Sequence, residues 1–420
     1  MHINMLTFRG RRVAAVLTAA IALVLLAVTA GSAAPNRAAA DELVIWADKD
    51  RKPAVERVAG QWGSARGVEI RVVEKEFGQI RNDLGTVKAE SAPDVIVGAH
   101  DWTGELAASG LLLPLNPSKA TRAQIPGYAL DSFSYGTAVK KLYGAPVAIE
   151  NIGLFVNTAL APVPRTWAAL ERSALAVKRR TKAPVGIAVQ QGAGGDAYHM
   201  YPFFSGLCGY IFGKNKAGNL DPSDIGLSSR RFLANAPLID KWNRQRLVSS
   251  KVDDSAAKDL FTKKKVAFWL TGPWNVDTAK KAAGKRLRIV QVPKIRCRSA
   301  PFLGVQGFMV TKYASAHNLE SAAKDLVGDF MLRTAAQSTL ASANNRFPAN
   351  TQAGKQVRDT YLAALGRASA GGVPMPNIPQ MASVWSELGG AWVKSTKGSG
   401  ATKASRSFRV AARNIANKIG

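Results

Sequence analysis

The stretch Met375-Pro376-Asn377-Ile378-Pro379-Gln380-Met381, followed by Trp385, is the most informative part of this chain. Its two prolines fix the backbone and remove two amide donors, so the stretch cannot be a central strand. We expect a rigid loop here, and then a new segment that carries Trp385 one turn after its start. A rigid loop that presents one aromatic side chain suits a ligand with a flat apolar face.

The length of 420 residues predicts two domains or one two-lobed body. Residues 1–40 are set apart: a basic start, an apolar run at 13–30 and small residues at 38–40 form an export signal. A membrane anchor is the alternative, because the apolar run could nearly span a bilayer. The small residues and the absence of a following basic cluster favour removal, and we expect an exported protein in the periplasm or at the cell surface.

The positions of the cysteines bear on two questions, whether the protein has a lipid anchor and whether it forms a disulfide. Many exported binding proteins are lipid-anchored through a cysteine that follows the apolar run, but Ser32 stands in that neighbourhood, so we expect no such anchor. The two cysteines are Cys208 and Cys297, and export permits a disulfide between them, although two free thiols are an open alternative. The four histidines form no ligand-spaced cluster with them, so we expect neither a metal nor another cofactor.

The positive charge is distributed unevenly. The formal net charge is +28, and removing the four arginines of residues 1–40 leaves +24. Residues 41–149 and 304–352 together carry as many acidic as basic residues, so the whole surplus lies in 150–303 and 353–420. Such a surplus attracts anionic partners.

Alternating strands and helices predict the fold. Leu43–Trp46 reads as a buried strand, the alternating stretch Val68–Val73 as a second strand and Asp94–Val97 as a third, with a helix at Ala54–Trp62 between the first two. This order indicates βαβ units and a mostly parallel sheet, at whose carboxyl edge ligands bind. Further along, Thr166 is a candidate helix cap and Val266–Leu270 another buried strand. We found no internal repeats.

Two extended stretches are candidate crossings between lobes, 143–157 and 302–310. We therefore predict an α/β, two-lobed fold in which each lobe is a mostly parallel sheet flanked by helices and hinge strands join the lobes. Its first lobe comprises 41–149 and 304–352, and its second, strongly basic lobe comprises 150–303 and 353–420.

Seven motifs occur in an order that resembles the maltose-binding proteins, the carbohydrate-capturing subunits of bacterial ABC importers. They are Val44-Ile45-Trp46 with Asp48-Lys49, Ala99-His100-Asp101, Gly110 to Leu115, Pro146 to Glu150, Pro164 to Trp167, Gly272-Pro273-Trp274 and Met375 to Trp385. The resemblance covers most of residues 43–420 and implies the two-lobed fold of periplasmic binding proteins, with a sugar held between the lobes. It also implies a monomer that delivers maltodextrin-type sugars to permease subunits in the membrane.

The resemblance assigns sugar-binding roles by position. It implies that Asp48, Lys49, Asp101 and Glu150 bind hydroxyl groups, which suits carboxylate acceptors and an ammonium donor. Tyr198, Trp274 and Trp385 would stack on sugar faces, with Ala99 and Trp102 also at the site. Each residue has an ordinary structural alternative: Asp48 could cap a helix, Glu150 could form a solvated ion pair, His100 could be a satisfied loop histidine and Trp274 could be core.

The chain also departs from the family pattern at several of these positions. Gly98 stands where the family has a tryptophan, Trp102 where it has an arginine, and Ser386 where it has a tyrosine beside Trp385. Trp102 would restore one stacking face. Oligosaccharides of α-linked glucose are therefore the first expectation, and a related saccharide is the alternative.

Three other functions compete with a non-enzymatic sugar receptor. A glycoside hydrolase would use two of the carboxylates Asp48, Asp101 and Glu150 at a set separation, which the sequence does not give. An exported binder of anionic polymers would use the basic charge, and contact with an anionic envelope is one form of it. Nucleic acid is not expected, because the aromatics are not interleaved with the basic runs. A receptor for an anion or a metal is disfavoured by the carboxylates and by the lack of histidine clusters.

Overall fold

The structure is a computed structural model that describes residues 42–136, 139–343 and 345–420. The predicted export signal lies outside these ranges. Residues 41–420 form one compact unit. Over the described part of this unit, no helix is both long enough and apolar enough to cross a membrane.

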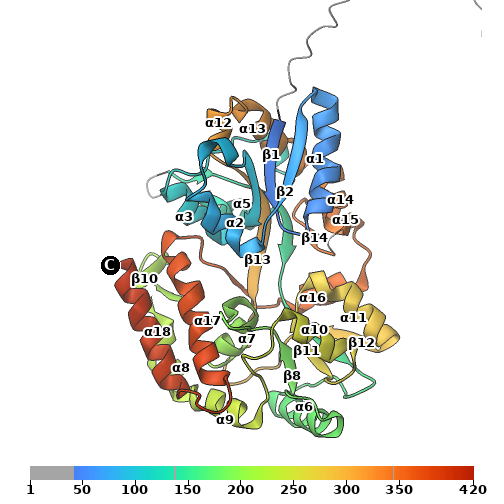
Figure 1. Ribbon diagram of the computed structural model, residues 1–420, viewed down its shortest axis with the longest axis vertical. Helices are drawn as coiled ribbons and strands as arrows, with labels where there is room; N and C mark the ends of the chain where they lie inside the picture. The colour runs from blue at the N-terminus through green and yellow to red at the C-terminus, as the bar shows by residue number, and fades with distance from the viewer. Residues whose placement is uncertain (1–41, 137–138, 344) are drawn as a thin grey trace, which may run out of the picture. The chain divides into compact units, whose positions relative to one another are not determined.

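The larger sheet has seven strands in the order β14-β6-β13-β3-β1-β2, with β15 paired to β13. The strands are β1 (Glu42–Ala47), β2 (Glu69–Glu74), β3 (Val95–Ala99), β6 (Ala145–Glu150), β13 (Phe302–Val310), β14 (Phe347–Pro348) and β15 (Val373–Pro374). The first three confirm the strands predicted from the sequence, and α1 (Lys52–Arg66) confirms the predicted helix between β1 and β2 (Figure 1).

The smaller sheet has four strands in the order β12-β7-β11-β8. They are β7 (Gly153–Asn157), β8 (Ile187–Val189), β11 (Phe268–Thr271) and β12 (Leu287–Val290). Two further strand pairs stand apart from both sheets, β9 (Phe212–Lys214) with β10 (Leu220–Ile225), and β4 (Ser134–Tyr135) with β5 (Lys141–Leu142).

The α/β, two-lobed fold class is confirmed, but the expectation of mostly parallel sheets needs correction. β1 is parallel to both β2 and β3 as predicted. β13, however, is antiparallel to β3 and β6, and β7 is antiparallel to β11 and β12. The difference arises because β6 and β13 are the two stretches at which the chain leaves and re-enters the larger sheet, and they run in opposite directions.

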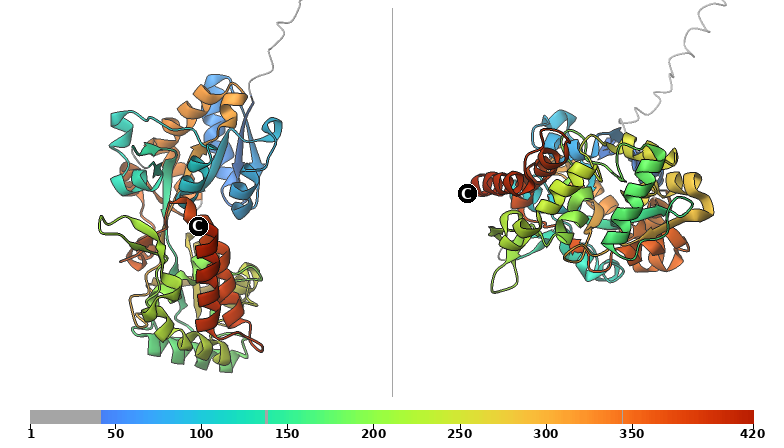
Figure 2. Two further views of the ribbon diagram at one scale, coloured as in Figure 1. Left: turned by 90° about the vertical axis from the view of Figure 1, so that its left-hand side faces the viewer. Right: turned by 90° about the horizontal axis from the view of Figure 1, so that it is seen from below.

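Helices flank both sheets (Figures 1 and 2). Those before the first crossing are α1, α2 (Phe77–Leu84), α3 (Thr103–Ala108), α4 (Lys119–Arg122) and α5 (Gly127–Ser132). Between the crossings lie α6 (Trp167–Thr181), α7 (Ala197–Gly206), α8 (Arg230–Asn235), α9 (Pro237–Gln245), α10 (Asp254–Thr262) and α11 (Val276–Ala283). The last group is α12 (Tyr313–Ala316), α13 (Glu320–Gly328), α14 (Thr334–Ala343), α15 (Thr351–Gln356), α16 (Thr360–Ala368), α17 (Ala382–Thr396) and α18 (Ala404–Ile419). Short 3-10 turns link several of them. Thr166 caps α6 as predicted, because its hydroxyl accepts the amide of Ala169 at 3.2 Å.

Both predicted crossings lie side by side. β6 ends at Glu150 and β7 begins at Gly153, so the chain passes between the sheets at Asn151 and Ile152. The Asn151 amide donates to the carbonyl of Leu365 at 3.0 Å, which holds this short connection. Gly304 of β13 pairs with Glu150, so the second extended stretch runs alongside the first.

The segment 375–381 docks as a loop against the larger-sheet side of the protein. It contains no strand, as its prolines predicted, and Pro379–Met381 forms a 3-10 turn before α17. The Asn377 amide donates to three carbonyl groups between residues 131 and 134. A Cβ at Gly104 would lie only 2.3 Å from the Asn377 carbonyl oxygen, so a glycine is required for this close approach.

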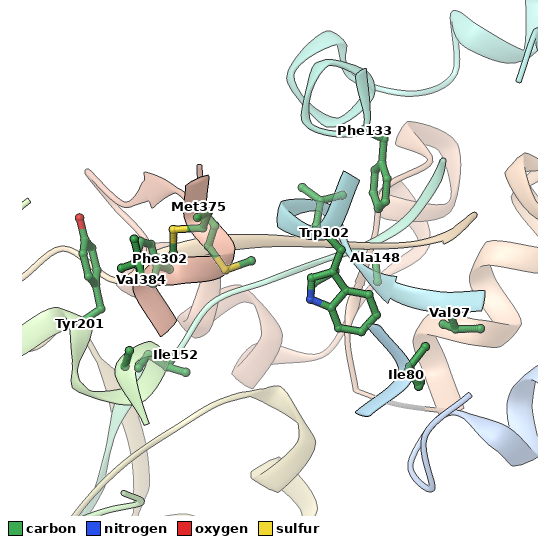
Figure 3. Packing of buried hydrophobic residues seen from close by; sticks show 14 of the residues in the cluster. Ile80, Val97, Trp102, Phe133, Ala148, Ile152, Tyr201, Phe302, Met375 and Val384 are labelled. Carbon is green, nitrogen blue, oxygen red and sulfur yellow. The ribbon is translucent and has the colours of Figure 1, made fainter. Parts of the chain in front are cut away.

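The core beneath this loop is aromatic. Tyr201 and Phe302 are almost fully buried and stack at a centroid distance of 3.5 Å, and Met375 and Val384 lie beside Phe302 (Figure 3). A disulfide between Cys208 and Cys297 answers the question that the sequence left open.

A partly exposed histidine, His317, forms an ion pair with the buried Asp94. His317 Nδ1 lies 2.7 Å from Asp94 Oδ1, and Nε2 lies 2.8 Å from the Ala89 carbonyl oxygen. Both partners only accept, so both ring nitrogens must carry protons for both bonds to form. Burial lowers the pKa of His317, but Asp94 and the Ala89 carbonyl outweigh burial and raise it above 6.5.

Candidate functional site

The loop after β1 places an acid and a base together. Asp48 is buried and forms an ion pair with Arg51, and its Oδ1 accepts the amide of Asp50 at 3.1 Å. Asp48 does not cap α1, whose cap residue is Arg51 and receives no side-chain hydrogen bond. Lys49 is exposed beside this pair.

Glu150 is the most heavily bonded carboxylate of the site. Its Oε1 accepts from Gln306 Nε2 at 2.7 Å and its Oε2 from Arg346 Nε at 2.5 Å, while Arg51 Nη2 lies 4.0 Å away. Burial disfavours ionisation of Glu150, but Arg346 and Arg51 outweigh it and lower its pKa. Glu150 is only 6 % exposed, so its ion pair is buried, contrary to the alternative of a solvated pair.

Two predicted or considered residues at the end of β3, Ala99 and His100, have structural surroundings. Ala99 is buried in the ladder opposite Gln306 and offers only a small side chain. His100 is a satisfied structural histidine, since Nε2 lies 3.0 Å from the Met375 carbonyl oxygen and Nδ1 accepts the amide of Val305 at 3.1 Å. Burial lowers the pKa of His100 to about 4, which keeps this ring neutral.

Asp101 contacts the aromatic residue that follows the docking loop. Its Oδ2 accepts the indole N–H of Trp385 at 3.0 Å, and this bond joins two predicted sugar-binding residues from opposite ends of the chain. Asp101 is 5 % exposed. Burial raises its pKa to about 6, more than Arg81 and the Trp385 N–H lower it.

Trp102 takes the space that Gly98 leaves open. A Cβ built on Gly98 would lie 2.1 Å from the Trp102 ring, so the glycine and the tryptophan are structurally coupled. The ring also packs on Phe77 at a centroid distance of 4.9 Å and is 5 % exposed. The loss of an aromatic at 98 is thus matched by an aromatic at 102 that covers the same backbone.

Aromatic side chains from four elements form the other side of the site. Tyr198 of α7 lies 6.5 Å from Trp274, and the Arg346 guanidinium lies 5.7 Å from the Trp274 ring centroid. Phe302 of β13 connects Tyr198, at 6.2 Å, with Trp385, at 5.7 Å. Trp274 and Trp385 are only partly buried, unlike the core tryptophans.

Buried polar atoms without hydrogen-bond partners gather here. Among the described residues they include the Tyr198 hydroxyl, His199 Nε2 and Gln306 Oε1. Gly304 lies between two of the site groups, because a Cβ there would be 3.1 Å from Glu150 Cγ and 3.6 Å from the Tyr198 oxygen. Burial first, and then the charge of Glu150, raise the pKa of Tyr198 well above 10, so the hydroxyl keeps its proton and can donate.

The structure therefore brings most predicted site residues into one connected set. Asp48 and Glu150 meet through Arg51, Glu150 and Trp274 meet through Arg346, and Asp101 bonds Trp385. Three predicted residues lie at the margin of this set. Trp102 contacts it through Phe77, because the Arg51 guanidinium lies 4.8 Å from the Phe77 ring centroid. Ala99 is connected through its pairing with Gln306, and Lys49 only as the chain neighbour of Asp48.

Sequence reasoning missed several residues of this set. Arg51 has a local signal, since it follows Asp48 by three residues. Arg346, Gln306 and Phe302 have none, because their partners are remote in sequence and their residue types are common. The described residues contain no group of histidine, cysteine and acidic side chains able to hold a metal ion.

The arrangement is one of binding. A family model for the bacterial extracellular solute-binding proteins matches residues 59–361, and the chain belongs to this family. It is a solute-binding protein and not an enzyme, so the glycoside hydrolase alternative is rejected.

Curated relatives and a solved structure share this architecture. The chain is 28% identical over 363 residues to the galactooligosaccharide-binding protein of Bacillus subtilis, covering 84% of each. It is 28% identical over 382 residues to the maltodextrin-binding protein MdxE of the same species, covering 86% of this chain and 87% of the relative. It is 27% identical over 393 residues to a maltooligosaccharide ABC transporter solute-binding lipoprotein of Streptococcus pneumoniae, covering 89% of each. The maltotriose-binding protein of Thermus thermophilus, solved with maltotriose, aligns with a TM-score of 0.78 and 25% identity over 90% of this chain and 100% of that one.

Proposed function

We propose that this protein captures oligosaccharides of α-linked glucose, of the maltodextrin type, and delivers them to the permease subunits of an ABC importer as a monomer. Relatives named for maltodextrin, maltooligosaccharide and maltotriose binding support the ligand class. One relative is named for galactooligosaccharides, which makes these the second candidate ligand.

The observation that carries the proposal is the combination of charge balance and unpaired polar atoms. The buried ions Asp48, Glu150, Arg51 and Arg346 sum to zero, and Asp101 adds one negative charge when it is ionised, so these buried groups hold no surplus of positive charge for an anionic ligand. The Tyr198 hydroxyl and its two neighbouring unpaired polar atoms lie where sugar hydroxyls, which both donate and accept, would satisfy them.

The partly buried tryptophans complete the fit. A pyranose ring has an apolar face of C–H groups, and indole faces cover such surfaces with a large contact area. We infer that Trp274 and Trp385 stack on sugar rings, while Asp48, Lys49, Asp101 and Glu150 bind hydroxyls. In this proposal a sugar hydroxyl competes with the Trp385 N–H for Asp101.

Titration calorimetry tests the ligand and the residues together. Maltose, maltotriose, longer maltodextrins and galactooligosaccharides are titrated into the parent and into Trp274→Ala and Trp385→Ala. Truncation of a central aromatic anchor costs about 2 kcal/mol or more, so each variant should bind roughly thirtyfold more weakly. Tyr128→Ala is the matched control, because Tyr128 is 58 % exposed and lies outside the site. Parent-like affinity in both tryptophan variants would refute the stacking roles, and tight binding of galactooligosaccharides alone would replace the proposed ligand.

The proposal includes two lobes that close on the sugar. The first comprises residues 41–149 and 304–352, the second 150–303 and 353–420, and the hinge lies near 147–151 and 302–307. A ligand held from both sides gains its full contacts only in the closed state, so it selects that state.

A second part of the proposed function concerns the basic lobe and the cell surface. We propose that its surplus charge holds the exported protein against an anionic envelope, where each well-placed Lys or Arg contributes about 1 kcal/mol. Release by rising salt from cells or anionic vesicles tests this, and Lys/Arg→Gln changes at 178–180 and 263–265 should lower the salt required. Complete release at low salt would contradict it.

A further inference from the structure

A pocket outside the sugar site lies among α9, α10 and the turn after α17. It has a volume of about 420 Å³ and shares no residue with the set around Glu150. Its walls are the end of α9 with Arg246, the end of α10 with Lys263 and Lys265, and the turn at 396–399. This volume is within the range that holds a small organic molecule.

Cations dominate the wall of this pocket. Arg246, Lys251, Lys263, Lys265 and Lys397 line it against a single carboxylate, Asp259. Asp259 already pairs with Lys263 at 2.6 Å, and in the described part of the chain the other four cations have no ion pair. Four exposed cations without an ion pair among the described residues therefore belong to the lining of one pocket.

The pKa of the neighbouring Lys178 responds to this concentration of positive charge. Its Nζ donates to the carbonyl of Gln245 at 2.8 Å, directly before Arg246. Burial, and then the charges of Arg246 and Arg179, lower the pKa of Lys178. An anion in the pocket would relieve this repulsion.

The pocket is also shaped by fixed structure. Asn243 bonds Gly398 twice, accepting its amide at 2.9 Å and donating to its carbonyl at 3.2 Å, and so holds the turn that carries Lys397. Arg246 keeps a left-handed backbone, with φ of 52°, at a helix end where glycine is usual.

Part of the pocket wall is apolar and accessible. Pro184 is exposed and Ala256 and Leu260 are partly exposed, and all three line the pocket, whereas the lining valines are at most 4 % exposed and offer almost no surface. A bare inorganic ion gains nothing from such a wall, whereas a ligand with a carbon skeleton buries apolar surface on it.

We propose that this basic pocket binds one repeating unit of a linear phosphodiester polymer, with the phosphates on the four unpaired cations and the carbon skeleton on Pro184, Ala256 and Leu260. A polymer fits better than a monomer because basic residues continue beyond the pocket, at 178–180 and at Lys264. This assignment deepens the envelope contact proposed above and does not depend on the sugar ligand.

The test compares two variants with equal charge loss. The pocket variant combines Arg246→Gln, Lys251→Gln, Lys265→Gln and Lys397→Gln. The matched control combines Arg172→Gln, Lys216→Gln, Lys281→Gln and Lys285→Gln, which are exposed residues between the same two crossings but away from the pocket. Binding of a poly(glycerol phosphate) is measured by calorimetry at several salt concentrations, with free glycerol 3-phosphate as competitor and anionic phospholipid vesicles as a separate arm.

We expect the pocket variant to bind the polymer at least about tenfold more weakly, with a shallower salt dependence, and the control to lose less than about threefold. Glycerol 3-phosphate should displace the polymer from the parent. Equal losses in the two variants, no displacement, no polymer binding by the parent, or binding to vesicles but not to the polymer would each overturn the assignment.

A sugar titration of the same three proteins keeps the two functions separate. All three should bind the sugar equally, because the pocket and the sugar site share no residue. A pocket variant that loses the polymer and keeps the sugar supports the assignment. Loss of the sugar together with the polymer in that variant would show that the changes act through the fold and would overturn it.

Discussion

Replacement of Asp101 by Asn should make the protein more stable at neutral pH while it weakens sugar binding. Asp101 is buried, and its pKa is raised from an ordinary 3.8 to about 6. The folded state therefore holds the proton more tightly than the unfolded state does. This contribution to stability is complete below pH 3.8 and is lost as the pH rises through about 6.

The size of the effect follows from the two pKa values. A difference between 3.8 and about 6 corresponds to on the order of 3 kcal/mol of destabilisation once Asp101 is ionised in the folded protein. An Asn side chain resembles the protonated acid, and its carbonyl can still accept the Trp385 indole N–H. Asp101→Asn should thus gain up to about this amount above pH 7 and little near pH 4.

Urea unfolding of the parent and of Asp101→Asn at pH 4.5, 6 and 7.5 measures the difference directly. Glu69→Gln is a suitable control, because it removes an exposed carboxylate that is not among the groups that shift the pKa of Asp101. The free-energy gap between the parent and Asp101→Asn should widen with pH and level off above 7. A gap that is constant, or that has the opposite sign at pH 7.5, would refute the argument from burial.

Sugar affinity gives an independent reading of the same group. If ionised Asp101 accepts sugar hydroxyls, the parent should lose about tenfold in affinity for each pH unit below 6, and Asp101→Asn should bind weakly at every pH. An affinity of the parent that does not change between pH 7.5 and 5 would exclude the ionised carboxylate as a sugar ligand.

Three further outcomes are expected. An NMR titration should place the pKa of His317 above 6.5, and in Asp94→Asn it should fall; a parent value at or below 6.5 would contradict the doubly donating ring. Loss of the disulfide in the Cys208→Ala, Cys297→Ala double variant should cost about 2–5 kcal/mol in denaturant unfolding, since the bridge joins residues 89 apart, and no loss would show that it does not stabilise the fold. Small-angle scattering should give a smaller radius of gyration under saturating maltotriose, and an unchanged radius would count against hinge closure.

The local elements were predictable because they rest on short-range patterns. Apolar runs located β1 and β3, alternation located β2, and the hydroxyl of Thr166 marked the start of α6. Strand direction was not predictable for β13, because it depends on which distant strands flank it, and these are β3 and β6. The pairing of the two cysteines likewise depends on the fold that brings them together.

The site was predictable where motifs have fixed local spacing. Asp101 and Trp385 were predicted from separate motifs. The hydrogen bond between them could not be predicted, because the two residues are 284 positions apart in the sequence. Arg346 left no local pattern, although it neutralises Glu150 and lies over Trp274. Trp102 was seen as a departure from the family, but its fit over Gly98 required the backbone.

The helices α17 and α18 come late in the sequence but complete the packing of elements that come much earlier. α17 and α18 pack on each other and against α7 and α9, and Trp392 and Phe408 are fully buried there with Phe204 and Phe232 (Figure 2). A chain in which these two helices have not folded lacks the contacts that Phe408 makes with Phe204 and Phe232. Such a chain exposes hydrophobic surface, and incompletely folded chains of this kind are prone to aggregate. Completion of the α7–α9 region is therefore coupled to a segment that lies far along the chain.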